Sequence, residues 1–259
     1  MRLYEQRPKC EIPRRDGRSI PHLRSAPFRS GRAQLFVTPE LPGIASAFLL
    51  QRERRPAEVF LRHGEAEWTW AETAYQAHAL ACALQEVGVE RGDRIGLNMP
   101  NWPEFVLSLL AASELGATVV PLNPAYSPRE LQFVLRNTEC SVVITAERFG
   151  GVEYLELFES LFSDLPGLQY LVTVGEEDLW YDDRIFQFED LVSAGRGRVC
   201  TPNPIGEEDP AAILYTAGVS EKQKGVVLSH SSLLETAART AGGLGLTADD
   251  VTLCAVPLF

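Results

Sequence analysis

The residues best suited to chemistry lie in one stretch, 215–230, which leaves a buried apolar strand and runs through small polar residues. Gly218 and Gly225 have no side chain, so the backbone there can approach a phosphate closely while nearby hydroxyl and amide groups donate to its oxygens. Lys224 adds a mobile positive charge. The Walker A spacing, G-x-x-x-x-G-K-S/T, is absent. From the residues alone, the stretch is either a phosphate-binding loop or an ordinary surface loop.

The cysteines and histidines offer a second kind of chemistry, metal binding or thiol exchange. The five cysteines are far apart in sequence and include no C-x-x-C pair, which favours reduced thiols over a disulfide framework or a zinc site. We therefore expect no metal site, with Cys82 and Cys254 in the core, His63 and His78 facing solvent, and His230 in a structural role. The cysteines are Cys10, Cys82, Cys140, Cys200 and Cys254.

Charge and composition limit the class of protein. The chain of 259 residues has a net charge of −11, and this sign argues against a nucleic-acid partner, which needs a basic surface. Residues 1–33 are basic and the remainder is strongly acidic, so we expect a solvated, poorly ordered tail over 1–40. No apolar run approaches the roughly 20 residues of a membrane helix, and no secretory apolar segment opens the chain. With reduced thiols, these features predict a cytoplasmic protein.

Helical and extended segments alternate from residue 41 onward and supply the elements that position the stretch at 215–230. Thr69 with Glu72, and Ser127 with Glu130, form the capping boxes of two helices, and Gly88 ends the first of them. This rhythm, with continuous Val, Ile and Leu in the strands, predicts an α/β fold with a mostly parallel sheet and helices on both faces. The expected helices begin near 70, 103, 128 and 152; the expected strands are 95–99, 118–122, 141–145, 170–174 and 211–216.

Two further regions complete the predicted organisation. Residues 175–209 are acidic and irregular, and we expect a surface connection with one short helix over 188–193. A last strand is expected near 251–256. The domains are then a tail over 1–40 and a single region over 41–259.

From about residue 41, the sequence resembles the superfamily of AMP-forming acyl-CoA synthetases and other adenylate-forming enzymes. Residues 215–230 are similar to its signature loop, Y-T-S-G-T-T-G-x-P-K-G-V-x-x-S-H. Four other segments also resemble family segments; they are 68–72, 92–101, 116–124 and 250–259. Residues 119–130 resemble ligases of fatty or other carboxylic acids more than peptide-synthetase modules.

The signature loop departs from the family pattern at four positions. Ala217, Val219, Glu221 and Gln223 replace family Ser, Thr, Gly and Pro, which removes two hydroxyl groups and adds a carboxylate where a triphosphate is expected. Like charge there opposes nucleotide binding. The positions that keep the pattern, and that the resemblance implies as nucleotide-binding residues, are Thr216, Gly218, Ser220, Lys224 and Gly225.

The resemblance implies a ligase that uses ATP, Mg²⁺ and CoA. A carboxylate attacks ATP to give an acyl-adenylate and diphosphate, and the CoA thiol then displaces AMP. The family's magnesium-binding motif, ribose-binding Asp and C-terminal catalytic Lys would follow Phe259. We therefore expect the N-terminal portion of such a ligase, with no catalytic residue of its own, no turnover alone, and apolar residues at the end of the chain exposed and open to self-association. The alternatives are a non-catalytic relative acting as an interaction module, and an adenylation domain or luciferase-like enzyme.

Overall fold

The computed structural model describes residues 43–176, 179, 182–201, 203–216 and 223–259. The tail expected over 1–40 lies outside these residues.

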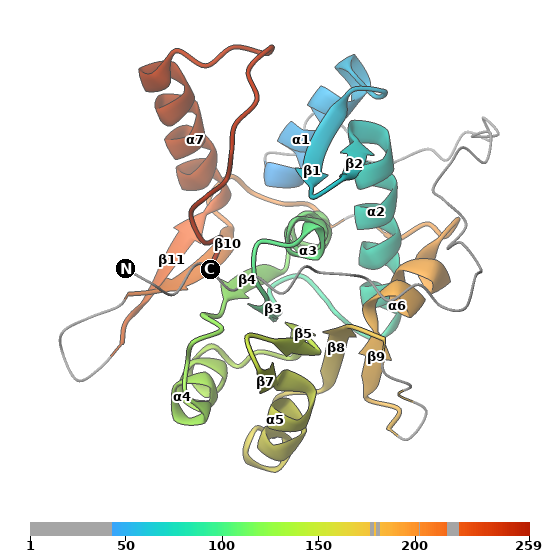
Figure 1. Ribbon diagram of the computed structural model, residues 1–259, viewed down its shortest axis with the longest axis vertical. Coiled ribbons are helices and arrows are strands. Elements are labelled where there is room, and N and C mark those ends of the chain that lie inside the picture. The colour runs from blue at the N-terminus through green and yellow to red at the C-terminus, as the bar shows by residue number, and fades with distance from the viewer. Residues whose placement is uncertain (1–42, 177–178, 180–181, 202, 217–222) are drawn as a thin grey trace. The chain divides into compact units, whose positions relative to one another are not determined.

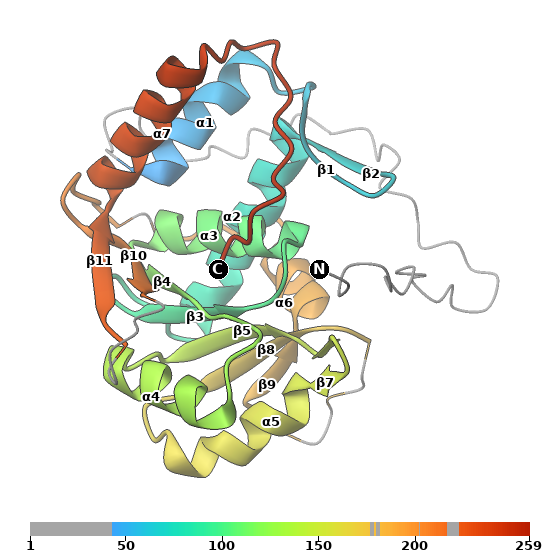
Figure 2. The ribbon, with the colours of Figure 1, turned by 60° about the vertical axis from the view of Figure 1, so that its left-hand side comes forward.

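A seven-stranded sheet forms the centre of the described fold (Figures 1 and 2). The strand order is β11-β10-β4-β3-β5-β8-β9, and every neighbouring pair is parallel except β10 with β11. The α/β prediction is therefore confirmed. The strands are β3 (Arg94–Asn98), β4 (Thr118–Pro121), β5 (Val142–Ala146), β8 (Tyr170–Val174), β9 (Ile185–Gln187), β10 (Pro210–Tyr215) and β11 (Gly225–Ser229).

Helices cover both faces of this sheet. On one face lie α2, α3 and α6, with α1 packed against α2 and α3; on the other lie α4 and α5, as the two views agree (Figures 1 and 2). The central strands β3, β4, β5 and β8 are consequently buried on both sides, whereas β11, at the edge of the sheet, leaves Val226 and Val227 exposed. The helices are α1 (Ile44–Arg54), α2 (Trp70–Glu86), α3 (Pro103–Leu115), α4 (Pro128–Thr138), α5 (Tyr154–Leu161, followed by a 3-10 turn, Phe162–Asp164), α6 (Phe188–Gly195) and α7 (His230–Leu244).

The starts of α2 and α4 are set by the capping boxes that the sequence predicts, and the end of α3 is set by a glycine. The Thr69 hydroxyl accepts from the Glu72 amide at 3.1 Å, and a Glu72 carboxylate oxygen accepts from the Thr69 amide at 2.9 Å. The equivalent box at Ser127 opens α4. Gly116 ends α3 with a φ of 72°, a left-handed value that glycine adopts without steric cost.

Several small elements were not expected. Strand β9 lies inside the acidic stretch 175–209 and pairs in parallel with β8 at the edge of the sheet. Two small antiparallel hairpins are separate from the main sheet: β1 (Val59–His63) with β2 (Ala66–Thr69), and β6 (Arg148–Phe149) with β7 (Val152–Glu153). The first holds Phe60 against Phe48 and Trp70, with ring centroids 4.9 and 4.4 Å apart, respectively.

The end of the chain corrects one expectation. Residues 251–256 form no strand, and Cys254 is exposed rather than buried. The backbone of the segment is held chiefly by the side chain of Asn101. The Asn101 side-chain amide donates to the Val256 carbonyl at 2.8 Å, and the Asn101 side-chain oxygen accepts from the Leu258 backbone amide at 2.9 Å. The expected exposure of apolar residues is confirmed, with Val251, Leu253 and Val256 at 86%, 87% and 72% exposed.

Among the described residues, none of the helices is both long and apolar enough to cross a membrane.

Candidate functional site

The carboxyl edge of the sheet contains a topological switch point. Strand β3 is followed by α3 on one face, whereas the neighbouring strand β4 is followed by α4 on the other (Figure 2). When the connections after two adjacent strands run to opposite faces of the sheet, they leave a crevice at the carboxyl ends of those strands. Open α/β sheets bind ligands in such a crevice. The edge formed by β3, β4 and their neighbours is therefore the first place to seek a site.

The chain that follows β10 leaves the sheet at this edge. Strand β10 runs parallel to β4 and ends at Tyr215, after which the chain turns back into β11. The Thr216 amide donates to the Lys224 carbonyl at 3.0 Å, which closes the base of the turn. Thr216, Lys224 and Gly225 are all exposed. Gly218 and Ser220 fall within 217–222, outside the described residues.

Tyr215 and Gly225 form a packed pair at the base of the turn. A Cβ atom on Gly225 would lie 3.1 Å from Cζ of Tyr215 and 3.1 Å from Cγ2 of Ile213. The Tyr215 ring is held in place by the Asn137 amide, which donates to its hydroxyl at 2.5 Å, and by the edge of the Phe133 ring. This close approach is a structural reason for a glycine at position 225, separate from any contact with phosphate.

A carboxylate stands beside the turn. The Gln223 amide donates to Glu130 Oε1 at 3.5 Å. The Ser127 hydroxyl and backbone amide both donate to the other carboxylate oxygen and lower the pKa of Glu130. A carboxylate that is charged at neutral pH therefore lies at the start of α4 and contacts Gln223, the residue before Lys224.

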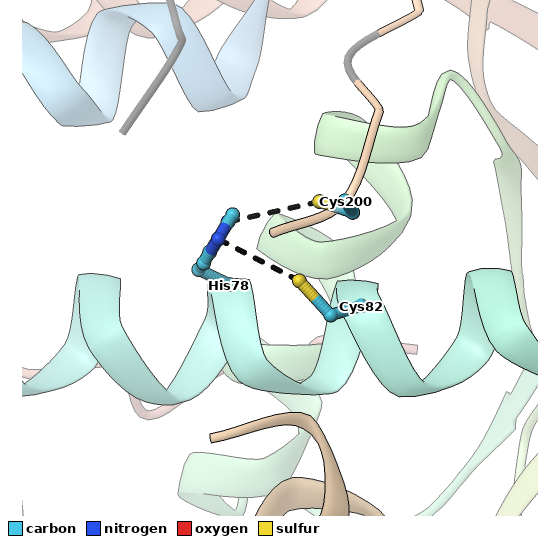
Figure 3. Close-up of side chains that lie close together, drawn as sticks. All are labelled: His78, Cys82 and Cys200. Carbon is cyan, nitrogen blue, oxygen red and sulfur yellow. Dashed lines mark hydrogen bonds between the residues drawn. The ribbon is translucent and has the colours of Figure 1, made fainter. Parts of the chain in front are cut away.

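A second cluster lies away from the turn, on the face that carries α2 and α3. His78 and Cys82 are one turn apart on α2, and Cys200 comes from the segment after α6 (Figure 3). The ligand atoms of these three residues all lie within 4.8 Å of one another. Glu114, near the end of α3, bonds to Nδ1 of His78. His78 is thus a partly buried, bonded residue, and the expectation that it faces solvent is wrong.

Burial and charge shift the acid–base properties of this cluster. The Glu114 carboxylate raises the pKa of His78, chiefly through their hydrogen bond. Burial raises the pKa of the Cys82 thiol, and burial together with the Glu114 charge raises that of Cys200. Cys82 is buried as expected. The sequence signal that was available is the i, i+4 spacing of His78 and Cys82 within a predicted helix.

His230 has a structural position. It is 1% exposed, and its Nδ1 accepts from the Ile44 amide at 3.3 Å, which ties the start of α7 to the start of α1. Burial lowers the pKa of His230, and the nearby Asp209 charge opposes this shift.

Comparison with known proteins identifies the lineage of this fold. The family model "AMP-binding enzyme" matches residues 48–259. The crotonobetaine/carnitine–CoA ligase of Salmonella agona is 28% identical over 193 residues, which cover 74% of this chain and 36% of that protein. The corresponding protein of Salmonella paratyphi C is 26% identical over 194 residues, again 36% of its length. The chain therefore spans about a third of the curated relatives that it matches.

Solved structures agree on the fold. A long-chain-fatty-acid–CoA ligase from Archaeoglobus fulgidus superposes with a TM-score of 0.71 at 24% identity, over 85% of this chain and 43% of that one. An anthranilate–CoA ligase in complex with anthranoyl-AMP superposes with a TM-score of 0.69 at 24% identity, over 78% of this chain and 37% of that one. At this level of identity, the likeness establishes the fold alone.

Proposed function

This chain belongs to the family of AMP-binding enzymes, and from that premise we propose that it forms the N-terminal part of an ATP-dependent carboxylate–CoA ligase. The observation that carries the proposal is the closed turn after β10, which places Thr216 and Lys224 at the carboxyl edge beside the switch point of the sheet. The names of the curated relatives, which are acid–CoA ligases, support the same reaction class. Fatty and other carboxylic acids are the proposed substrates.

The reaction brings two anions together, because a carboxylate attacks the α-phosphorus of ATP. Catalysis then depends on groups that neutralise charge as it builds on the leaving diphosphate. In this proposal, the Lys224 ammonium and the amides of the turn bind the β- and γ-phosphates, and Thr216 and Ser220 add hydroxyl donors. Gly218 and Gly225 allow the backbone to come close to the phosphates.

The described residues around the turn do not supply a magnesium site. Mg²⁺ requires near-octahedral oxygen ligands. The acid found there in the described part of the chain is Glu130, and its Oε2 already accepts from the Ser127 amide at 2.7 Å and the Ser127 hydroxyl at 2.7 Å. We therefore derive no step through the metal ion.

Turnover is proposed to need more than this chain contains. The match covers only 36% of the length of these curated relatives. Most of their residues therefore have no counterpart in the matched region. The ligase activity, the carboxylic acid substrate and the binding of CoA are therefore proposed for an enzyme that also contains the regions found in the relatives outside the match.

The test joins this chain in frame to the remaining part of the Salmonella agona relative and measures ATP–diphosphate exchange with a panel of carboxylic acids. Lys224→Ala is expected to lower exchange by about 100-fold, because one cation at the leaving group is lost. Arg239→Ala is the matched control, since Arg239 is an exposed cation on α7 paired only with Glu235 among the described contacts. Equal exchange by the two variants would contradict the assigned role of Lys224.

A second candidate is an interaction module without catalysis. The exposed Val251, Leu253 and Val256 favour it, because contiguous exposed apolar surface promotes association. Light scattering of the 259-residue chain over a range of concentrations distinguishes the two: a concentration-dependent assembly that Leu253→Ser disrupts would support this role, and a monomer at high concentration would count against it.

A further inference from the structure

We propose that His78, Cys82 and Cys200 bind a Zn²⁺ ion, with Glu114 orienting the imidazole. The proposal is independent of the adenylation chemistry. It rests on donors from two separate segments, α2 and the chain after α6, that the fold brings to one place (Figure 3).

The spacing of the donor atoms suits a tetrahedral ion. Zn–S bonds of about 2.3 Å and Zn–N bonds of about 2.0–2.1 Å place the ligand atoms of a tetrahedral site about 3.5–3.8 Å apart. Cys82 Sγ lies 3.6 Å from Nε2 of His78, which is already the spacing of two ligands of one ion. Cys200 Sγ lies 3.8 Å from Nδ1, the nitrogen bonded to Glu114, while the ligand atoms of all three residues stay within 4.8 Å of one another. Binding at Nε2 therefore requires the Cys200 sulfur to move from the Nδ1 side of the ring toward Nε2.

The type and spacing of the donors select the metal. Two thiolates and one imidazole favour Zn²⁺ over Mg²⁺ or Ca²⁺, which prefer oxygen ligands. His78 and Cys82 occupy positions i and i+4 of one helix face, so the rigid backbone of α2 holds two of the three ligands before the ion arrives. A water molecule takes the fourth position.

Glu114 is a positioning residue in this arrangement. It bonds to Nδ1 of His78, which directs the lone pair of Nε2 toward Cys82. Carboxylates commonly hold metal-binding histidines in this way, and their loss weakens metal affinity by about 10–100-fold. The Glu114 side chain is only 9% exposed, and a cation between the two thiols gives this buried negative charge a counter-charge.

The experiment uses the full chain of 259 residues with Cys10→Ser and Cys254→Ser, which removes two thiols outside the cluster. After dialysis against a chelator, Zn²⁺ is added and the metal content is measured by mass spectrometry; about one ion per chain is expected for a single site. Co²⁺ substitution should give thiolate-to-metal charge transfer and the intense visible bands of a tetrahedral site.

Variants assign the ligands. Cys82→Ser and Cys200→Ser are each expected to weaken Zn²⁺ affinity by about 100-fold or more in competition with a chromophoric chelator. Cys140→Ser is the matched control, because Cys140 is a buried thiol bonded to Thr138 instead. Glu114→Gln should weaken affinity by about 10–100-fold while the number of ions per chain stays the same, and Glu114→Asp should restore most of the loss.

Three results would overturn the proposal: zinc content below about 0.1 ion per chain where one strong site would be saturated, unchanged affinity in Cys200→Ser, or a Cys82–Cys200 disulfide that forms in place of metal binding. If a cysteine variant fails to fold, the Co²⁺ spectrum of the unsubstituted cluster decides the question, because thiolate-to-metal charge transfer requires cysteine ligands. Absence of these bands from the folded chain would contradict the proposal.

Discussion

Helix α6 approaches α2 so closely that Gly195, its last residue, has no room for a side chain. A Cβ atom at this position would lie 1.8 Å from the carbonyl oxygen of Ala79 and 2.7 Å from its carbonyl carbon. The obstacle is helix backbone, which cannot rotate away as a side chain can. Gly195→Ala therefore tests how tightly the layer of helices is packed.

The size of the effect follows from the required displacement. Carbon and oxygen atoms approach to about 3.3 Å, so α6 must move by about 1.5 Å. That shift disturbs Phe188, Leu191 and Val192, which are all at most 5% exposed. Overpacking of this kind costs about 1–3 kcal/mol, and we expect the upper end, about 3 kcal/mol, because backbone rather than side chain must give way.

Urea unfolding followed by circular dichroism measures the change in the free energy of unfolding. Gly167→Ala is the matched control, since a Cβ there meets nothing within 4 Å, and it should change stability by less than about 0.5 kcal/mol. A Gly195→Ala variant as stable as the control would refute the reasoning about helix packing. Since Cys200 follows α6 closely, the same variant should also bind Zn²⁺ more weakly.

Three other outcomes are expected. Thr69→Ala removes the side-chain cap of α2 and should lower the free energy of unfolding by about 1 kcal/mol in the same urea assay. His230 has a lowered pKa in the fold, so the unfolded chain, with an ordinary pKa of about 6.5, takes up a proton first; stability should fall as the pH is lowered through about 6.5, and less so in His230→Asn. An equal fall in both proteins would assign the effect to other groups. In the joined ligase, Glu221→Gly removes a carboxylate near the proposed triphosphate and should tighten ATP binding by about tenfold, worth about 1.4 kcal/mol; unchanged binding by calorimetry would show that the altered loop is not impaired.

The parts of the fold that the sequence predicts are those determined by neighbouring residues. The capping boxes at Thr69 and Ser127 act over a few positions, and the structure confirms them. Long apolar runs also identify strands such as 170–174, which the structure places at the same residues. These signals need no knowledge of distant parts of the chain.

What the sequence could not predict depends on distant partners. Strand β9 has only three residues and is a strand because β8 offers it a sheet edge. The apolar alternation at 251–256 indicates a strand, but the segment has no strand neighbour among the described residues and stays irregular. Cys200 joins His78 only because α6 packs on α2, a contact between residues more than 100 positions apart.

The position of the proposed metal site indicates a structural role rather than a catalytic one. Helix α3 begins at Pro103, just after β3 leaves the carboxyl edge of the sheet, and Glu114 lies near its other end. At a rise of 1.5 Å per residue, these two positions are about 16 Å apart. The ion would join α2 and the segment after α6, and through Glu114 it would also hold α3, so that one layer of helices is linked at the end remote from the switch point.

Chelation should therefore lower the melting temperature of the chain, by about 5–10 °C if Zn²⁺ had been present at about 100 times its Kd. In the joined ligase, the exchange rate per folded molecule should stay the same. A loss of exchange that precedes unfolding would instead place the ion in the reaction.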